Sequence, residues 1–191
     1  KFPMIPFYIY YSMFGFQRIH DLAWAAGDSR ARGFLLGATS GRTTLNGEGL
    51  QHQDGHSHIF AGTIPNCRSY DPCFSYELST IIKEGIRDMY ELNNDRYYYI
   101  TLMNENYFHP ERQENISDEM IMKGAYPFLT QKSSDIRILA SGLTLNFAID
   151  AQKKLKEYDL AVEIWSITSF NELFREGIKV ERSNRMFDKK D

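Results

Sequence analysis

The stretch that decides the fold is FYIYYSMFGFQRIHDLAWAAGDSRARGFLL, residues 7–36. Its aromatic and Ile-rich beginning predicts a buried strand over 7–11. Apolar side chains then recur at helical spacing, so we expect a helix over 14–30 that ends at Gly33. A second short buried strand is expected over 34–36. A strand, a helix and a strand in this order are typical of one unit of an α/β layer.

The same alternation continues further along the chain. Asp71 and Pro72 suit the N-cap and the first turn of a helix that runs to about residue 90, and residues 96–103 follow as a buried strand. Another unit of strand, helix, strand and helix is expected at 136–139, 143–158, 160–167 and 171–180. We therefore predict an α/β fold with mainly parallel sheets and flanking helices.

Residues 109–132 divide the chain into two parts. They are rich in Glu, Gln, Asn and Ser, and apart from a short extended piece at 125–129 they lack apolar periodicity. We interpret them as a linker between a first domain over 1–108 and the beginning of a second domain over 133–191. Because no initiator Met is present, we expect the chain to begin inside a domain.

The composition bounds the class of protein. With 42% hydrophobic and 25% charged residues, the chain has an ordinary globular composition rather than a disordered one. A net charge of −3 favours neither nucleic-acid nor membrane binding, and no apolar run is long enough to span a bilayer. The spacing of Cys67 and Cys73 is not a zinc pattern, so we expect reduced thiols in a cytoplasmic protein.

The polar, Gly-rich loop at 37–58 is long enough to suggest a function. It holds three of the five His residues of the chain, His52, His56 and His58, together with Asp54. Three interpretations remain open: the side chains bind a metal, they hold the loop together, or at least one His acts in acid–base catalysis or substrate binding.

A second candidate feature lies where the first predicted strand turns into a helix. In open α/β sheets, ligands bind just outside the carboxyl ends of the strands. The rings of Tyr11 and Phe14 could stack there on a flat heterocycle, or they could simply belong to the core. Arg18 lies four residues after Phe14 and shares its helix face, although it could equally be a solvated surface cation.

Four stretches of the chain are unusual enough to carry a resemblance. They are PMIPFYIYYSMFGFQRI (3–19), DLAWAAGDSRARGFLLGATSGRTTLNGEGLQHQDGHSH (21–58), TIPNCRSYDP (63–72) and YYYITLMNENY (97–107). They closely resemble the homodimeric, thiamine-diphosphate-dependent decarboxylating subunits of pyruvate dehydrogenase, a family related to transketolase. The resemblance continues more weakly through ILASG and EIWSITSFNEL.

This resemblance implies a fold. The first domain would be the later half of a transketolase-like pyrimidine-binding domain. The second would be the first part of a transketolase C-terminal-like α/β domain.

The resemblance also implies roles for four residues. Tyr11 and Phe14 would lie beside the cofactor aminopyrimidine, His52 would face the substrate, and Arg18 would lie near the cofactor. Tyr11 and His52 are therefore the catalytic candidates, and we predict that Tyr11, Phe14 and His52 converge on one concave surface at the carboxyl edge of the sheet.

The implied cofactors are thiamine diphosphate and Mg²⁺. Their diphosphate and metal ligands, and the glutamate that activates the aminopyrimidine, would lie outside this chain, so no metal ligand is assigned here and the isolated chain is expected to be inactive. The implied partners are pyruvate, the lipoyl domain of dihydrolipoyl acetyltransferase and a second subunit of a homodimer. Two alternatives are another thiamine enzyme of the transketolase family and a non-catalytic binding module with the same fold.

Some positions depart from the family pattern. His20 stands where Gly is expected and Gln53 where Glu is expected, while Cys73 and Phe74 replace small residues or Tyr. Gln53 borders the candidate loop, so an altered pH profile is conceivable in the intact enzyme.

Overall fold

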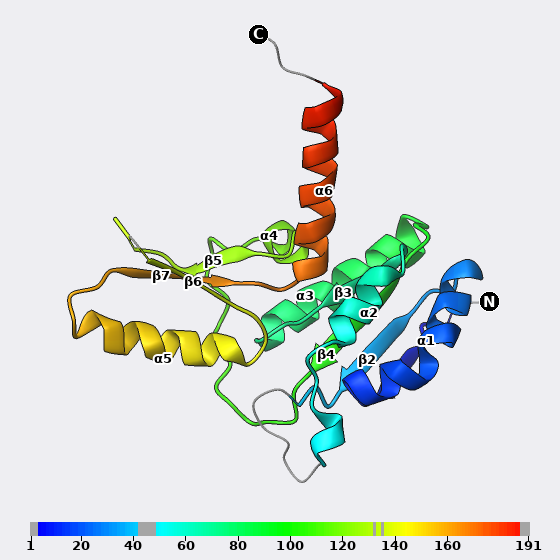
Figure 1. The fold of residues 1–191 in the computed structure, drawn as a ribbon, viewed down its shortest axis with the longest axis horizontal. Coiled ribbons are helices and arrows are strands. Elements are labelled where there is room, and N and C mark those ends of the chain that lie inside the picture. The colour runs from blue at the N-terminus through cyan, green and yellow to red at the C-terminus, as the bar shows by residue number, and fades with distance from the viewer. Residues whose placement is uncertain (1–3, 42–48, 132, 135, 188–191) are drawn as a thin grey trace.

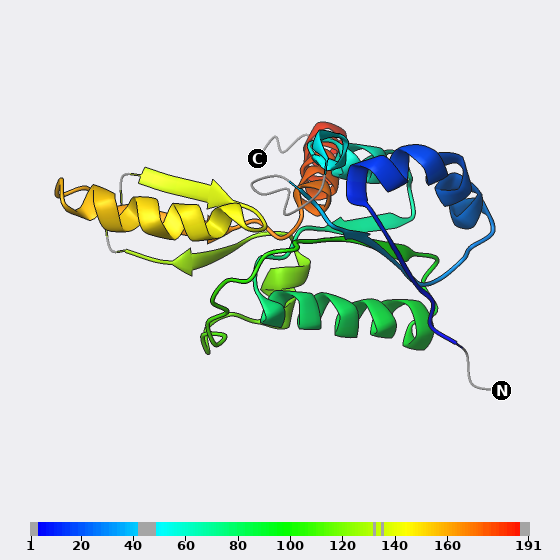
Figure 2. The same cartoon turned by 90° about the horizontal axis from the view of Figure 1, so that it is seen from below.

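The computed structural model describes residues 4–41, 49–131, 133–134 and 136–187. Two α/β parts lie side by side, each with its own sheet (Figures 1 and 2). No helix of the described ranges is both long and apolar enough to cross a membrane.

The first sheet is fully parallel, as predicted. Its strand order is β1 (Phe7–Tyr10), β2 (Phe34–Ala38), β4 (Tyr97–Leu102), β3 (Cys67–Tyr70). Helices cover both faces: α1 (Ser12–Asp28) and α2 (Ser57–Thr63) lie on one face, and α3 (Ser75–Ile86), which continues into the π-helical turn η2 (Arg87–Glu91), lies on the other (Figure 2).

The aromatic run of β4 explains why this strand is central. Tyr98 points to the α3 face, where its ring lies 5.7 Å from that of Phe34. Tyr99 points to the α1 face, where its ring lies 5.0 Å from that of Phe16. All of these rings are buried. A strand that is covered on both faces has no polar alternation, which is why its sequence is a continuous apolar run.

Two expectations about the first part are wrong. The strand at residues 7–11 is not buried, because β1 is the edge strand and the side chains of Phe7, Tyr8 and Ile9 are 46%, 53% and 64% exposed. The helix expected from Asp71 begins instead at Ser75.

The capping of α3 explains the second difference. The side chain of Glu77 reaches back and accepts hydrogen bonds from the backbone N–H groups of Cys73 (2.6 Å) and Phe74 (2.9 Å). Glu77 is the third residue of α3, and it binds the backbone N–H groups of the N-cap residue Phe74 and of Cys73, as the Glu of a capping box does.

The second sheet has the order β5 (Tyr126–Leu129), β7 (Val162–Ser166), β6 (Ile136–Ala140). Strands β6 and β7 are parallel, whereas β5 is antiparallel to β7. Helix α5 (Thr144–Lys156) packs on this sheet through Leu145 and Ala148. Strand β6 begins at Ile136, as the sequence predicted.

The segment interpreted as a linker contains regular structure. It holds α4 (Asp118–Met122) and β5, and β5 is a strand of the second sheet. The limits of the two domains remain a prediction.

Two buried carboxylates join the parts. Besides capping α3, Glu77 accepts hydrogen bonds from the hydroxyls of Tyr126 and Ser166, each at 2.6 Å. Asp71 accepts one from the hydroxyl of Ser141 at 2.5 Å. Buried carboxylates with this many donors hold adjoining elements in one arrangement.

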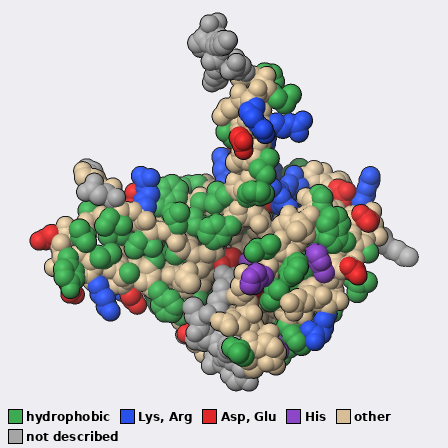
Figure 3. Space-filling view, viewed as in Figure 1, with side chains coloured by type: hydrophobic (Ala, Val, Ile, Leu, Met, Phe, Trp, Pro, Cys, Tyr) green, Lys and Arg blue, Asp and Glu red, His purple; other side chains and the backbone are tan. Residues whose placement is uncertain are grey.

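Helix α6 (Phe170–Met186) starts at this junction and projects away from the body (Figures 1 and 3). None of its residues is buried. It packs across the edge of β3, where the hydroxyl of Ser169 donates to Ser69 O at 2.6 Å and Arg175 donates to Cys67 O at 2.8 Å.

Candidate active site

The four candidate residues lie together beside the carboxyl end of β1. The ring of Tyr11 stacks on the imidazole of His52, with centroids 4.3 Å apart and planes 20° from parallel. The ring of Phe14 meets the same imidazole edge to face, with centroids 5.3 Å apart and an angle of 85°. The Arg18 guanidinium lies 3.5 Å from the centroid of the Phe14 ring. The rings of Tyr11, Phe14 and His52 therefore converge as expected, whereas the concave surface expected around them stays a prediction.

Local structure places Tyr11 and Phe14. Tyr11 is the extended residue that precedes α1, so its side chain leaves the sheet as the helix begins. Ser12 fixes this turn, because its backbone N–H and its hydroxyl both donate to Thr39 O, at 3.4 and 3.2 Å. Gly15 permits the close approach of α1 to β1, since a Cβ there would lie 2.0 Å from the ring of Tyr10.

His52 comes from the other side of the site. It is the last residue of the short 3₁₀ turn η1 (Leu50–His52). The backbone N–H of His52 donates to Gly49 O at 3.0 Å. The His52 Nδ1 atom is buried and has no hydrogen-bond partner among the described residues. A buried ring nitrogen without a partner calls for an explanation, and a bound ligand is one.

The site combines flat surfaces with two polar groups. Tyr11 is 43% exposed, so part of its ring is available to a ligand. The Arg18 guanidinium contributes a positive charge, and its Nη1 also donates to Phe14 O at 3.1 Å. An anionic, planar molecule would find both shape and charge complementarity here.

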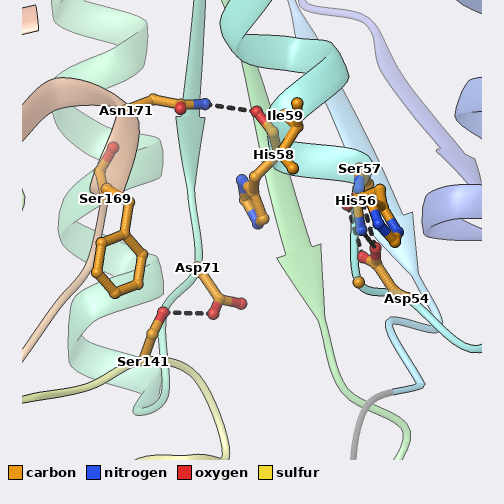
Figure 4. A pocket seen from close by; sticks show the side chains of 11 residues that line it. Asp54, His56, Ser57, His58, Ile59, Asp71, Ser141, Ser169 and Asn171 are labelled. Carbon is orange, nitrogen blue, oxygen red and sulfur yellow. Dashed lines mark hydrogen bonds between the residues drawn. The ribbon is translucent and has the colours of Figure 1, made fainter. Parts of the chain in front are cut away.

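The three His residues of the loop do not gather in one place. His58 lies on α2 and lines a different cavity, of about 370 Å³, between the two parts (Figure 4). Its Nε2 atom lies 2.9 Å from the hydroxyl of Thr101, which in turn donates to Asp71 at 2.5 Å. His56 lines the same cavity. Within the described ranges, no three His, Cys, Asp or Glu side chains are grouped so that they could hold a metal ion.

This cavity contains a connection that the sequence analysis missed. The Asp71 carboxylate accepts hydrogen bonds from Thr101 of β4 and from Ser141 of the second part, and Figure 4 shows the bond to Ser141. Asn171, at the start of α6, donates to the backbone oxygen of His58 at 2.7 Å. No local sequence signal reveals these contacts, because the partners lie 30 and 70 residues from Asp71 and meet only in the folded chain.

The cysteines are not candidates for nucleophilic chemistry. Cys67 and Cys73 are both free and buried. Burial raises the pKa of the Cys67 thiol to about 12, and burial likewise raises the pKa of Cys73. Since the thiolate is the reactive form, both side chains act as small apolar core residues.

Comparisons with known proteins cover both parts of the chain. Residues 2–110 match the family model described as pyruvate dehydrogenase E1 component middle domain, and residues 124–190 match the transketolase-like C-terminal domain.

The curated relatives are larger proteins. The pyruvate dehydrogenase E1 component of Pseudomonas aeruginosa is 56% identical over 188 residues, which cover 96% of this chain and 21% of that protein. The protein of the same name from Escherichia coli K12 is 55% identical over 188 residues, with the same coverage. The chain therefore spans about a fifth of the length of these relatives.

Solved structures agree on the fold. The transketolase of Campylobacter jejuni superposes with a TM-score of 0.74 at 18% identity and covers 90% of this chain and 26% of its own. The transketolase of Leishmania mexicana gives 0.67 at 21% identity, with 88% and 24% covered. These neighbours show the transketolase-like architecture of the chain.

Proposed function

The chain belongs to the pyruvate dehydrogenase E1 component family, and we propose that it forms part of an enzyme that decarboxylates pyruvate with thiamine diphosphate. The observation that carries this proposal is the stack of His52 on Tyr11, with Phe14 at its edge. These are the three residues that the family resemblance assigns to the cofactor and the substrate.

The described residues fit the proposed cofactor. Tyr11 and Phe14 present aromatic rings against which a flat aminopyrimidine would pack. The Nδ1 atom of His52 offers a hydrogen bond that none of the described residues uses. When bound, thiamine diphosphate supplies the electron sink for loss of the carboxylate, while the protein binds and orients.

His52 is proposed to act on substrate-derived atoms. Stacking on Tyr11 restricts the rotation of its imidazole, so Nδ1 points in one direction. From there the ring would donate a hydrogen bond to a carboxylate or move a proton at a substrate oxygen. Arg18 would hold the Phe14 ring and add positive potential that attracts the pyruvate carboxylate.

The remaining parts of the reaction would come from elsewhere in the longer protein. We propose that the ligands of Mg²⁺ and of the diphosphate, and the activating glutamate, lie outside this chain. The intact enzyme would work as a cytoplasmic homodimer and reductively acetylate the lipoyl group of dihydrolipoyl acetyltransferase. Family membership supports these features.

A transketolase activity is the alternative function. The solved transketolases share the fold at 18–21% identity, whereas the E1 relatives share 50–56% of residues. The sequence therefore favours pyruvate over a ketose phosphate as the substrate.

The test is a turnover assay of the intact protein with thiamine diphosphate and Mg²⁺. Release of CO₂ from pyruvate, with reduction of an artificial electron acceptor, is expected. Turnover with a ketose phosphate alone would support the transketolase alternative. Turnover with neither substrate would support a non-catalytic module.

A further inference from the structure

Asp54 lies two residues after His52 in the candidate loop. Its side chain is buried, and the hydrogen bonds that reach it include four from Ser40, His56 and Ser57 (Figure 4 shows the part of this arrangement that faces the cavity). One oxygen accepts from the backbone N–H groups of His56 (3.1 Å) and Ser57 (3.0 Å). The other accepts from the hydroxyls of Ser40 (3.1 Å) and Ser57 (2.6 Å).

These bonds tie the loop at two ends. Those from His56 and Ser57 hold the first turn of α2, and the one from Ser40 holds the residues that follow β2. All four partners are donors, so the environment is built for a carboxylate and not for an amide.

The anchor on the β2 side is shared with Tyr11. Ser12, the residue after Tyr11, is bonded twice to the backbone oxygen of Thr39, and Asp54 is bonded to the adjacent Ser40. The backbone of Asp54 adds a further link, because its N–H donates to Gly41 O at 2.8 Å. Both rings of the stack are therefore fixed to one short segment at the end of β2.

From this geometry we propose that Asp54 is a positioning residue for His52. Through Ser40, its carboxylate sets the place of His52 against Tyr11 and thereby the direction of the His52 imidazole. The expected loss of turnover rests on the proposed function. The placement of the rings of Tyr11 and His52 does not, because it can be measured without turnover. Asp54 does not touch substrate in this account, and it acts only through His52.

A merely structural role for Asp54 makes a different prediction. If the carboxylate served only to cap α2, its loss would lower stability without changing the turnover of folded protein. If it positions His52, turnover falls while the affinity for the cofactor is preserved. A misplacement of about 1 Å in a site can cost about 10²-fold in rate.

The experiment uses the intact enzyme with the substitution Asp54→Asn. We expect kcat with pyruvate to fall by about 10²-fold, with thiamine diphosphate affinity unchanged within a few-fold. Asp88→Asn is the matched control, because Asp88 is also a buried carboxylate with several donors, Asn94, Arg96 and Tyr98, but lies away from His52. It should retain the turnover of the unmodified enzyme.

A pair of serine variants keeps the test decisive if Asp54→Asn does not fold. Ser40→Ala and Ser57→Ala each remove one hydroxyl from the same carboxylate oxygen, and both serines are fully buried. Of the two serines, Ser40 is the one in the segment after β2 to which Ser12, next to Tyr11, is also bonded. Ser40→Ala is therefore expected to lower turnover more than Ser57→Ala.

A readout independent of activity follows the imidazole itself. In cofactor-free protein, diethyl pyrocarbonate labelling of His52, measured by peptide mass mapping, should be several-fold faster in Asp54→Asn and Ser40→Ala than in Asp88→Asn. Unchanged labelling in both variants, or full turnover in folded Asp54→Asn, would overturn the inference. If the unmodified enzyme does not turn over pyruvate, the proposed function fails, while the labelling rates still decide whether Asp54 positions His52.

Discussion

The imidazole of His52 stacks on the phenol ring of Tyr11, with ring centroids 4.3 Å apart. The two residues come from different segments, the turn before α1 and the turn η1, and the strand β2 lies between them in the sequence. The stack therefore exists only when the first sheet has formed. In the proposed function, this stack links the fold of the chain to the reaction.

The stack itself can be tested with two substitutions of Tyr11. Tyr11→Phe keeps the ring and should leave turnover with pyruvate within a few-fold of the unmodified enzyme. Tyr11→Ala removes the surface that orients His52 and packs on the cofactor, so kcat/KM is expected to fall by about 10²-fold. Steady-state kinetics of the intact enzyme decides this. Equal losses in the two variants would mean that the hydroxyl, and not the ring, is what matters.

The junction of the two parts depends on Glu77. This carboxylate is fully buried and accepts hydrogen bonds from Tyr126, Ser166 and two backbone N–H groups. Glu77→Ala leaves these donors without a partner and creates a void, so a loss of about 3–5 kcal/mol in unfolding free energy is expected. Urea denaturation measures it. Glu119→Ala, which removes an exposed partner of Lys123, is the control and should have no measurable effect.

Asp118 should contribute stability near neutral pH that is lost in acid. Hydrogen bonds from Lys83 and then Arg112 lower the pKa of Asp118 to about 2, against an ordinary value of 3.8. A carboxyl whose pKa is lowered by folding stabilises the fold above its unfolded pKa and loses this contribution as the pH falls toward its folded pKa. The contribution of Asp118 is therefore complete above about pH 4 and is lost between about pH 4 and 2.

The measurement is the unfolding temperature as a function of pH for the unmodified protein and Asp118→Asn. The two curves should be separated near neutral pH and should converge as the pH approaches 2. A constant separation down to the lowest pH would show that Asp118 has no folded-state shift.

Thiol chemistry tests the packing of the first part. Because burial raises the pKa of Cys67 to about 12, this thiol should resist alkylation by iodoacetamide at pH 8 in the native protein. Cys73, also buried, should behave in the same way. Peptide mapping should find both residues modified only after unfolding in guanidinium chloride. Rapid modification of native Cys67 would show that the core between α1, α2 and β3 is open.

The sequence was informative where neighbouring residues decide structure. The aromatic and Ile-rich run within residues 96–103 predicted a buried strand, and β4 is a buried inner strand of the first sheet. The apolar spacing of residues 143–158 likewise predicted a helix, and α5 spans Thr144–Lys156. In both cases, side chains close in sequence share one buried surface.

The sequence was less informative where distant contacts decide structure. Strand β3 and the short helix α2 were not expected, because CRSY and SHIFAGT carry little apolar periodicity. β3 is fixed instead by pairing with β4 and by side chains of α6 across its edge. The start of α3 was misplaced for the same reason, since Asp71 is occupied with Thr101 and Ser141.

The candidate site contains residues of both kinds, some that could be selected from the sequence and one that could not. Family resemblance selected Tyr11, Phe14, Arg18 and His52, and the structure brings all four together. It did not select Asp54, whose importance comes from bonds to Ser40 and Ser57. Its role could not be recognised from composition, because an Asp in a loop gives no sign of how many donors will surround it.

We propose that His52 acts on substrate-derived atoms, and the kinetics of His52→Ala in the intact enzyme test this role. Loss of acid–base assistance typically costs about 10²–10⁴-fold, so kcat with pyruvate should fall by that factor. The affinity for thiamine diphosphate, measured by calorimetric titration in the presence of Mg²⁺, should change only slightly. Unchanged turnover in a folded, cofactor-loaded His52→Ala enzyme would contradict the account.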